Sequence, residues 1–299
     1  MKHKLTRSCG PMAVALALAS GLAAAGCGDD EGSSGSSKAT QTSSSATTPS
    51  AAEALDRVVK IDGGRGLYVR CTGAGSPTVV MEGGDGDTSD SYAFAEPAVS
   101  RVTRACVYDR ANLGQSDPAP GPRGLNELVG DVELLLEAAR IPGPYVLVGT
   151  SGGGYITAGY AYEHPRDVAG LVFVDTGGPF LNPPKKIVEE TDPDSPDNTE
   201  KRDYLQVEKD AWNARERVGD IPVKVITVKP SAEAIREAPF VAERRLLRRN
   251  VKTQQGWLVL SPRAEQIVVN TGHAVEEEDP DRVINAILDT VRKARRTRR

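Results

Sequence analysis

Residues 146–154, with the sequence VLVGTSGGG, join a short apolar run to a cluster of small residues around one serine. Gly149, Ser151 and Gly153 have the spacing G-x-S-x-G, and a helical pattern follows at once. This order predicts a strand, a sharp turn and a helix, with the serine at the tip of the turn. Small neighbours are needed because the turn strains the serine backbone and exposes its hydroxyl. A hydroxyl placed in this way is a candidate nucleophile for acyl transfer.

A serine hydroxyl is a weak nucleophile until a base removes its proton, so we expect a histidine to reach Ser151. The chain has three histidines. His3 lies in an N-terminal segment that we expect to be removed. His164 stands at the end of the helix after the serine, where it is typical of a helix cap. His273, between a predicted strand and the last predicted helix, is the remaining candidate base.

Short apolar runs alternate with helical patterns and predict the frame that positions these groups. We expect strands at residues 67–70, 78–81, 106–108, 145–148, 171–174, 223–228 and 266–269. Helical spacing covers residues 127–140 and 280–296, with Pro280 in a first-turn position. This alternation is typical of an α/β fold with a mostly parallel sheet of about eight strands and helices on both faces.

The charge balance is mildly acidic, with 37 Lys and Arg against 41 Asp and Glu in 299 residues. This balance gives no reason to expect a nucleic-acid partner. A basic cluster at residues 292–299 is interpreted as a solvated helix end and tail. Residues 51–299 have a length that suits a single α/β domain.

Residues 1–26 have the order of an export signal, with a basic start and an apolar run too short for a permanent membrane span. The small residues before Cys27 resemble the lipobox of bacterial lipoproteins, although Ala24 stands where leucine is typical. That resemblance implies that the signal is removed and that Cys27 carries a lipid. The alternative is an ordinary secreted protein with a leftover cysteine. Residues 27–50 are rich in Ser, Thr and Gly and predict a flexible tether.

Residues 177–217 interrupt the alternating pattern. They are rich in Pro, Asp, Glu and Lys, and they show little periodicity before Tyr204. They follow a strand end, and ligands of open α/β sheets bind outside the carboxyl ends of the strands. We therefore expect an insertion that covers a pocket as a lid. The alternative is a disordered surface loop.

Several motifs, taken in order, resemble the α/β-hydrolase family across roughly residues 55–297. Besides the serine turn they are PTVVMEGG at 77–84, YDRANLGQS at 108–116, VAGLVFVD at 168–175 and TGH at 271–273. The order of nucleophile, acid and histidine is also that of the family. The resemblance implies a serine hydrolase that needs no cofactor, with Ser151 as nucleophile and His273 as general base.

The acid of this triad has two candidates. A carboxylate should hold the tautomer of His273 and stabilise its imidazolium form. The family usually supplies it after the strand at 223–228, where this chain has Glu233 and no aspartate. Some members, such as certain haloalkane dehalogenases, carry the acid one strand earlier, which Asp175 ends. We favour Asp175, whose other interpretation is a strand-end residue that bonds local amides.

The same resemblance implies two backbone N–H groups that bind the oxyanion. One is expected from Gly152, the residue after the nucleophile. The other is expected from Gly84, with Asp85 as the second choice. The family often has histidine where this chain has Glu82, so the loop departs from the family pattern at this position.

The family's sheet order places the strand ending near Cys71 antiparallel beside the strand starting near Cys106. In an exported chain this implies a disulfide, and the alternative is two buried thiols. We expect no metal. The spacing of an EF-hand calcium loop is matched by Asp85, Asp87, Ser89, Ser91 and Glu96, but Asp90 stands where that loop requires glycine.

These features predict an exported, lipid-anchored serine hydrolase on the extracytoplasmic face of the cell membrane. A carboxylic ester of a small-molecule acyl substrate is the favoured target. Peptidase, lactonase or acyltransferase activity on the same triad remains open, because the lid sets the pocket. Dehalogenases and epoxide hydrolases use an aspartate where this chain has Ser151. A further alternative is an envelope lipoprotein that keeps the fold and binds a ligand without turnover.

Overall fold

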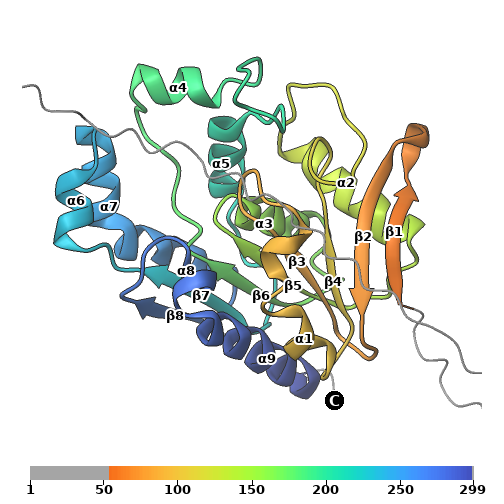
Figure 1. Ribbon diagram of the computed structural model, residues 1–299. Helices are drawn as coiled ribbons and strands as arrows, with labels where there is room; N and C mark the ends of the chain where they lie inside the picture. The colour runs from red at the N-terminus through yellow and green to blue at the C-terminus, as the bar shows by residue number, and fades with distance from the viewer. Residues whose placement is uncertain (1–53, 298–299) are drawn as a thin grey trace, which may run out of the picture. The chain divides into compact units, whose positions relative to one another are not determined.

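The computed structural model describes residues 54–297 and is drawn in Figure 1. Within these residues one sheet has the strand order β1-β2-β4-β3-β5-β6-β7-β8. The strands are β1 (Leu55–Lys60), β2 (Gly66–Thr72), β3 (Thr78–Glu82), β4 (Ala105–Tyr108), β5 (Tyr145–Thr150), β6 (Val168–Val174), β7 (Val223–Val228) and β8 (Ala264–Val269). The predicted signal, Cys27 and the predicted tether lie outside the described residues.

The sheet is mixed but mostly parallel. The pairs β1–β2 and β2–β4 are antiparallel. Every pair from β4 across the sheet to β8 is parallel. The central strands β5 and β6 are buried along their whole length, as expected for parallel strands covered on both faces.

Helices cover both faces of the sheet (Figure 1). Apolar side chains of α2 (Leu125–Ala138), α3 (Gly153–Glu163) and α5 (Tyr204–Asn213) pack into one core layer. Those of α1 (Glu96–Ser100), α8 (Val275–Glu278) and α9 (Pro280–Thr297) pack into the other. Alternate residues of β5 enter the two layers, because successive side chains of a strand point to opposite faces. The predicted fold class is confirmed.

The seven predicted strands are present as β2 to β8, and each predicted end lies within three residues of the observed one. The helices predicted at 127–140 and 280–296 are present as α2 and α9, and the helix predicted after Ser151 is α3. The strand β1 was not predicted. It is an edge strand in which only Val59 is fully buried, so it lacks the clear alternation of a half-buried strand.

Two helical insertions follow the carboxyl ends of neighbouring strands. The segment that we predicted as a lid, 177–217, contains α4 (Lys185–Thr191) and α5. The second insertion, between β7 and β8, holds α6 (Ala232–Glu237), α7 (Val241–Gln254) and a 3-10 helix at Gln255–Leu260. No pattern in the sequence predicted α7, because five of its 14 residues are Lys or Arg and its apolar face is weak.

Two further 3-10 helices, Asp62–Gly64 and Ser89–Tyr92, lie in connections between strands. None of the helices in the described part of the chain combines the length and the apolar character needed to cross a membrane.

The sheet is crosslinked beside its antiparallel edge. Cys71 on β2 and Cys106 on β4 are direct partners in the antiparallel register and form a disulfide. Both residues are buried. The predicted disulfide is therefore confirmed in the structure.

Candidate active site

Ser151 lies in the turn between β5 and α3, and its φ of +48° falls in the left-handed region. That conformation is strained for a residue with a side chain. A Cβ on Gly149 would lie 2.5 Å from the Cα of Gly154, and one on Gly153 would collide with the carbonyl oxygen of Gly83. The small residues around the serine are therefore required by the close approach of the turn to its neighbours.

The structure brings Ser151, His273 and Asp175 into one chain of hydrogen bonds. The Oγ of Ser151 lies 2.9 Å from Nε2 of His273. The Nδ1 of His273 lies 2.7 Å from Oδ2 of Asp175. The three residues follow β5, β8 and β6, whose carboxyl ends meet at one rim of the parallel sheet. A proton on the serine hydroxyl is thus within direct reach of the imidazole.

Asp175 is held more firmly than the sequence suggested. Its Oδ1 accepts hydrogen bonds from the N–H of Val228 at 3.0 Å, from Asn250 at 3.1 Å and from Gln254 at 2.6 Å. Burial alone would raise the pKa of Asp175, but the hydrogen bond and charge of His273, with these donors, lower it. Asn250 and Gln254 lie one turn apart on α7, and nothing in the sequence marked them.

The hydrogen bond to Asp175 raises the pKa of His273 above its ordinary value, although burial opposes the shift. The side chain of His273 is 63 % exposed and that of Asp175 only 7 %. The other candidate acid, Glu233, lies exposed in the first turn of α6. It makes no ion pair or hydrogen bond within residues 54–297, and Asp175 is the carboxylate that meets the imidazole.

The loop after β3, residues 83–87, passes beside Ser151. The N–H of Gly84 donates to Oδ2 of Asp87 at 2.9 Å, and the N–H of Asp87 donates to the carbonyl of Gly84 at 3.2 Å. The predicted oxyanion donor Gly84 is thus engaged in a closed turn. In contrast, the N–H groups of Asp85 and Gly152 have no acceptor in the described part of the chain.

One arginine from the first insertion joins these two residues. Arg202 is completely buried. Its Nη1 donates to Oδ1 of Asp85 at 2.6 Å, and its Nη2 donates to the carbonyl of Gly152 at 2.9 Å. The Asp85 carboxylate lies so close to Gly152 that a Cβ there would collide with it. A single guanidinium therefore fixes the spacing of the two residues whose amides are free.

A second buried arginine, Arg110, bonds the backbone of the same loop, residues 83–87. Arg110 forms ion pairs with Glu82 at 2.6 Å and with Glu200 at 2.8 Å. It also donates to the carbonyls of Gly83 and Gly84 at 2.8 and 2.6 Å. We call Glu82, Arg110 and Glu200 the ion cluster. Arg110 belongs to the motif at 108–116 that carried the family resemblance, whereas nothing in the sequence marked Glu200.

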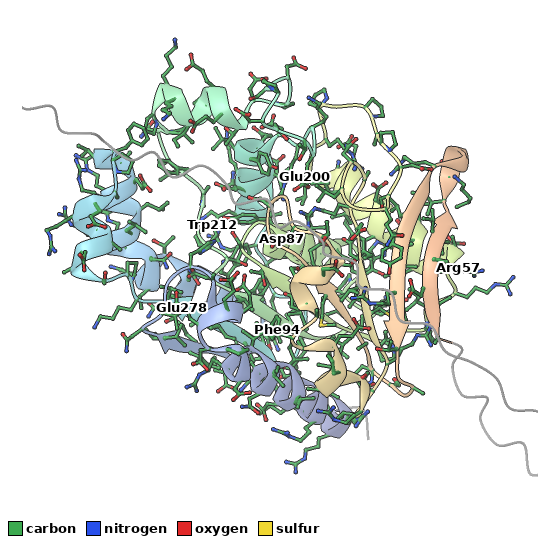
Figure 2. All side chains as sticks on the ribbon, viewed as in Figure 1. Arg57, Asp87, Phe94, Glu200, Trp212 and Glu278 are labelled. Carbon is green, nitrogen blue, oxygen red and sulfur yellow. A yellow bond between two sulfur atoms is a disulfide. The ribbon has the colours of Figure 1, made fainter. Side chains whose placement is uncertain are left out.

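The ion cluster is sealed and internally bonded. Oε1 of Glu200 also accepts from the N–H of Gly86 at 2.6 Å, and Tyr108 donates to Glu82. Figure 2 labels Glu200 close to Asp87, the residue that follows Gly86. Burial raises the pKa of Glu82 to about 7 despite the neighbouring Arg110. Glu82, which stands where the family often has histidine, is thus a buried anchor of the loop.

The acidic residues at 85–96 find partners within the protein. Asp85 pairs with Arg202, while Asp90 and Glu96 both pair with Arg70. Among residues 54–297, no group of three or more His, Cys, Asp or Glu is arranged to hold a metal ion.

The profile of the α/β hydrolase fold family matches residues 77–244, more than half of the chain. The chain belongs to the α/β-hydrolase fold family. Two solved structures of similar fold superpose at a TM-score of 0.62. A thermophilic esterase from Thermogutta terrifontis is 19 % identical and covers 80 % of this chain and 99 % of its own. An enol-lactonase from Burkholderia xenovorans LB400 is 16 % identical and covers 78 % and 99 %.

These low identities establish the shared α/β-hydrolase fold alone. Among curated sequences, a protein of Hormonema carpetanum named as a probable transporter is 36 % identical over 131 residues. That match covers 41 % of this chain and 19 % of the relative. The chain spans less than half the length of the first curated relatives that it matches.

Proposed function

We propose that this α/β-hydrolase is a serine hydrolase that cleaves an acyl bond of a small-molecule substrate, with a carboxylic ester as the favoured target. The observation that carries this proposal is the chain of hydrogen bonds from Ser151 through His273 to Asp175. Ser151 attacks the acyl carbonyl, and His273 takes its proton and returns it to the leaving group. Asp175 stabilises the imidazolium, and water then releases the acyl group.

The oxyanion of the tetrahedral intermediate needs two N–H donors. Gly152 supplies one of them, as the sequence predicted. We assign the other to Asp85, because the Gly84 amide already donates to Asp87. Arg202 bonds both Asp85 and Gly152, so it acts as a positioning residue for this pair. It also balances the charge of the Asp85 carboxylate, which would otherwise oppose an oxyanion nearby.

The choice of an ester is supported by the fold relatives. One solved neighbour is described as an esterase and another as an enol-lactonase. Both names denote cleavage of an acyl–oxygen bond, which a serine triad of this geometry can perform without a cofactor. A lactone is accordingly the second candidate substrate. Peptidase and acyltransferase activities would use the same triad, but no contact in the structure favours them.

Labelling with a fluorophosphonate probe tests the proposal. The probe reacts with an activated serine, so the wild-type protein should be labelled and Ser151→Ala should not. Ser231→Ala, which removes an exposed serine at the start of α6, should label like the wild type. A wild-type protein that resists the probe would instead support a ligand-binding protein without turnover. Hydrolysis of esters and lactones of graded chain length then defines the substrate.

We also propose that Cys27 carries a lipid and holds the protein on the extracytoplasmic face of the cell membrane. The support is the order of the N-terminal segment, a basic start, an apolar run and small residues before the cysteine. Cys27→Ser should move the protein from the membrane fraction to the soluble fraction. A variant that stays with the membrane would overturn the anchor and leave the hydrolase proposal untouched.

A further inference from the structure

A groove of about 840 Å³ lies between residues 179–183, α5 and α7. Figure 1 shows α5 and α7 on opposite sides of the segment that leads from β6 to α4. We call this space the α5–α7 groove. Its volume is in the range of sites that hold small organic ligands.

The walls of the groove combine apolar surface with positive charge. Phe180, Trp212 and Leu246 supply aromatic and aliphatic surface. Lys209 lines the groove from α5, and Arg245 and Arg249 line it from α7. The two arginines are four residues apart, so they project from the same face of their helix.

These three cations differ from the buried arginines near Ser151. Lys209, Arg245 and Arg249 are exposed, and none of their side chains makes an ion pair or hydrogen bond within the described part of the chain. The lining has one acidic side chain, Asp203, whose Oδ1 accepts the N–H of Gln206 at the start of α5. The groove is therefore electropositive, and a bound anion would not have to displace an internal partner.

The α5–α7 groove and the candidate active site share two segments, α7 and the chain that follows β6. Arg249 and Thr253 line the groove, and the residues after each of them, Asn250 and Gln254, bond Asp175. Phe180 follows Asp175 by five residues, which limits the separation of their Cα atoms to about 18 Å. This value is an upper limit, so esters of graded chain length test which acyl chain spans the distance from Ser151 to the groove.

We propose that the α5–α7 groove binds the distal carboxylate of an anionic acyl substrate whose ester carbonyl lies at Ser151. The guanidinium groups of Arg245 and Arg249 present paired N–H donors that match a carboxylate, and Lys209 adds a third positive charge. The apolar chain between carboxylate and ester lies along Phe180, Trp212 and Leu246. This inference rests on the proposed hydrolase function and adds the substrate class to it.

Pairs of esters of equal chain length test the assignment, from 4-nitrophenyl octanoate and the mono-4-nitrophenyl ester of octanedioic acid up to their sixteen-carbon homologues. The two esters of a pair differ only in the terminal carboxylate. The variant Arg245→Gln/Arg249→Gln should raise KM for the anionic ester about tenfold to hundredfold, since each lost charged hydrogen bond weakens binding. Its KM for the neutral ester should stay at the wild-type value. Salt should raise KM for the anionic ester alone.

Arg248→Gln is the matched control, because Arg248 is an exposed residue of α7 outside the groove lining. The proposal is overturned if the double variant affects both esters equally, or if Arg248→Gln has the same effect as the double variant. A wild type that hydrolyses neither ester contradicts the hydrolase function instead. Direct titration with octanedioate then tests whether the groove binds a carboxylate, since the wild type should bind octanedioate and the double variant should not.

Discussion

The triad and the ion cluster both pair carboxylates with basic side chains, but the two regions differ in how far these side chains are exposed. In the triad, the side chain of His273 is 63 % exposed, and that of its partner Asp175 is 7 % exposed. In the ion cluster, the side chains of Glu82, Arg110 and Glu200 are 6 %, 4 % and 1 % exposed. The triad is open on the side where a substrate must arrive. The ion cluster is closed on all sides and bonded to the backbone of the loop beside Ser151.

The difference follows from the cost of moving charge. A catalytic imidazole gains and loses a proton, so it needs access to substrate and water. A structural ion pair needs partners instead of access, because burial without a partner would cost several kcal/mol for each ion. Each N–H group of the Arg110 guanidinium accordingly donates to a carboxylate or to a backbone carbonyl. The site thus places the hydrogen-bonded chain from Ser151 to Asp175 beside a loop, residues 83–87, that the ion cluster holds in place.

The largest expected effect separates the two candidate acids. Asp175→Asn keeps the shape of the side chain but loses the charge that stabilises the imidazolium. We expect kcat for ester hydrolysis to fall about 10⁴-fold. Glu233→Gln should retain wild-type kcat, because Glu233 is exposed on α6 and takes no part in the hydrogen bonds of the imidazole. Equal losses for the two variants would contradict the assignment of the acid.

The next effect concerns the ion cluster. Arg110→Met removes the cation and leaves Glu82 and Glu200 buried without it. We expect the free energy of unfolding in urea to fall by about 3–5 kcal/mol. Arg57→Met, on the edge strand β1 where Figure 2 shows Arg57 at the rim of the molecule, should change it by less than about 0.5 kcal/mol. A similar small change in both would mean that the cluster does not support the fold.

Arg202 tests the connection between the two regions. Arg202→Met frees Asp85 and Gly152 to move apart, and we expect kcat to fall about 10²-fold with little change in KM. Arg202→Lys, which keeps a charge but loses the fork, should recover part of that loss. Thermal unfolding of each variant separates lost stability from lost positioning. A purely structural role would lower Tm and leave kcat of the remaining folded protein unchanged.

The disulfide between Cys71 and Cys106, like the ion cluster, is a buried structural contact. Replacing both Cys71 and Cys106 with alanine should lower the free energy of unfolding by about 2–4 kcal/mol, because the unfolded chain is no longer crosslinked over a separation of 35 residues. The kcat of the folded variant should be unchanged, since the bond lies between β2 and β4. A selective loss of kcat would show that the crosslink acts on the site.

The smallest expected effect is a shift in the pH dependence of kcat/KM, which follows the pKa of the exposed His273. The base must be neutral to accept a proton, and Asp175 raises the pKa of His273 above 6.5. The acid limb of kcat/KM should therefore lie above pH 6.5. The charge of Glu276 also raises the pKa of His273, so Glu276→Gln should move this limb to lower pH. A limb that stays in place would exclude Glu276 from the electrostatics of the base.

The sequence predicted the parts of the molecule that have a local signature. Strong apolar runs fixed seven strands, and the G-x-S-x-G spacing marked Ser151 because only small residues permit that turn. His273 followed from the scarcity of histidine and from the family resemblance. The edge strand β1 and the polar helix α7 were missed, because neither buries a regular apolar face.

The chain by itself therefore determined the sheet, the serine turn and a short list of acids and bases. Tertiary structure decided which of them meet. Whether Asp175 or Glu233 faces His273, and whether the Gly84 amide is free, depends on contacts between residues far apart in the chain. Arg202, Asn250 and Gln254 are ordinary polar residues in sequence. They gain their roles only when the two insertions fold back over one rim of the sheet, where their side chains bond Asp85, Gly152 and Asp175.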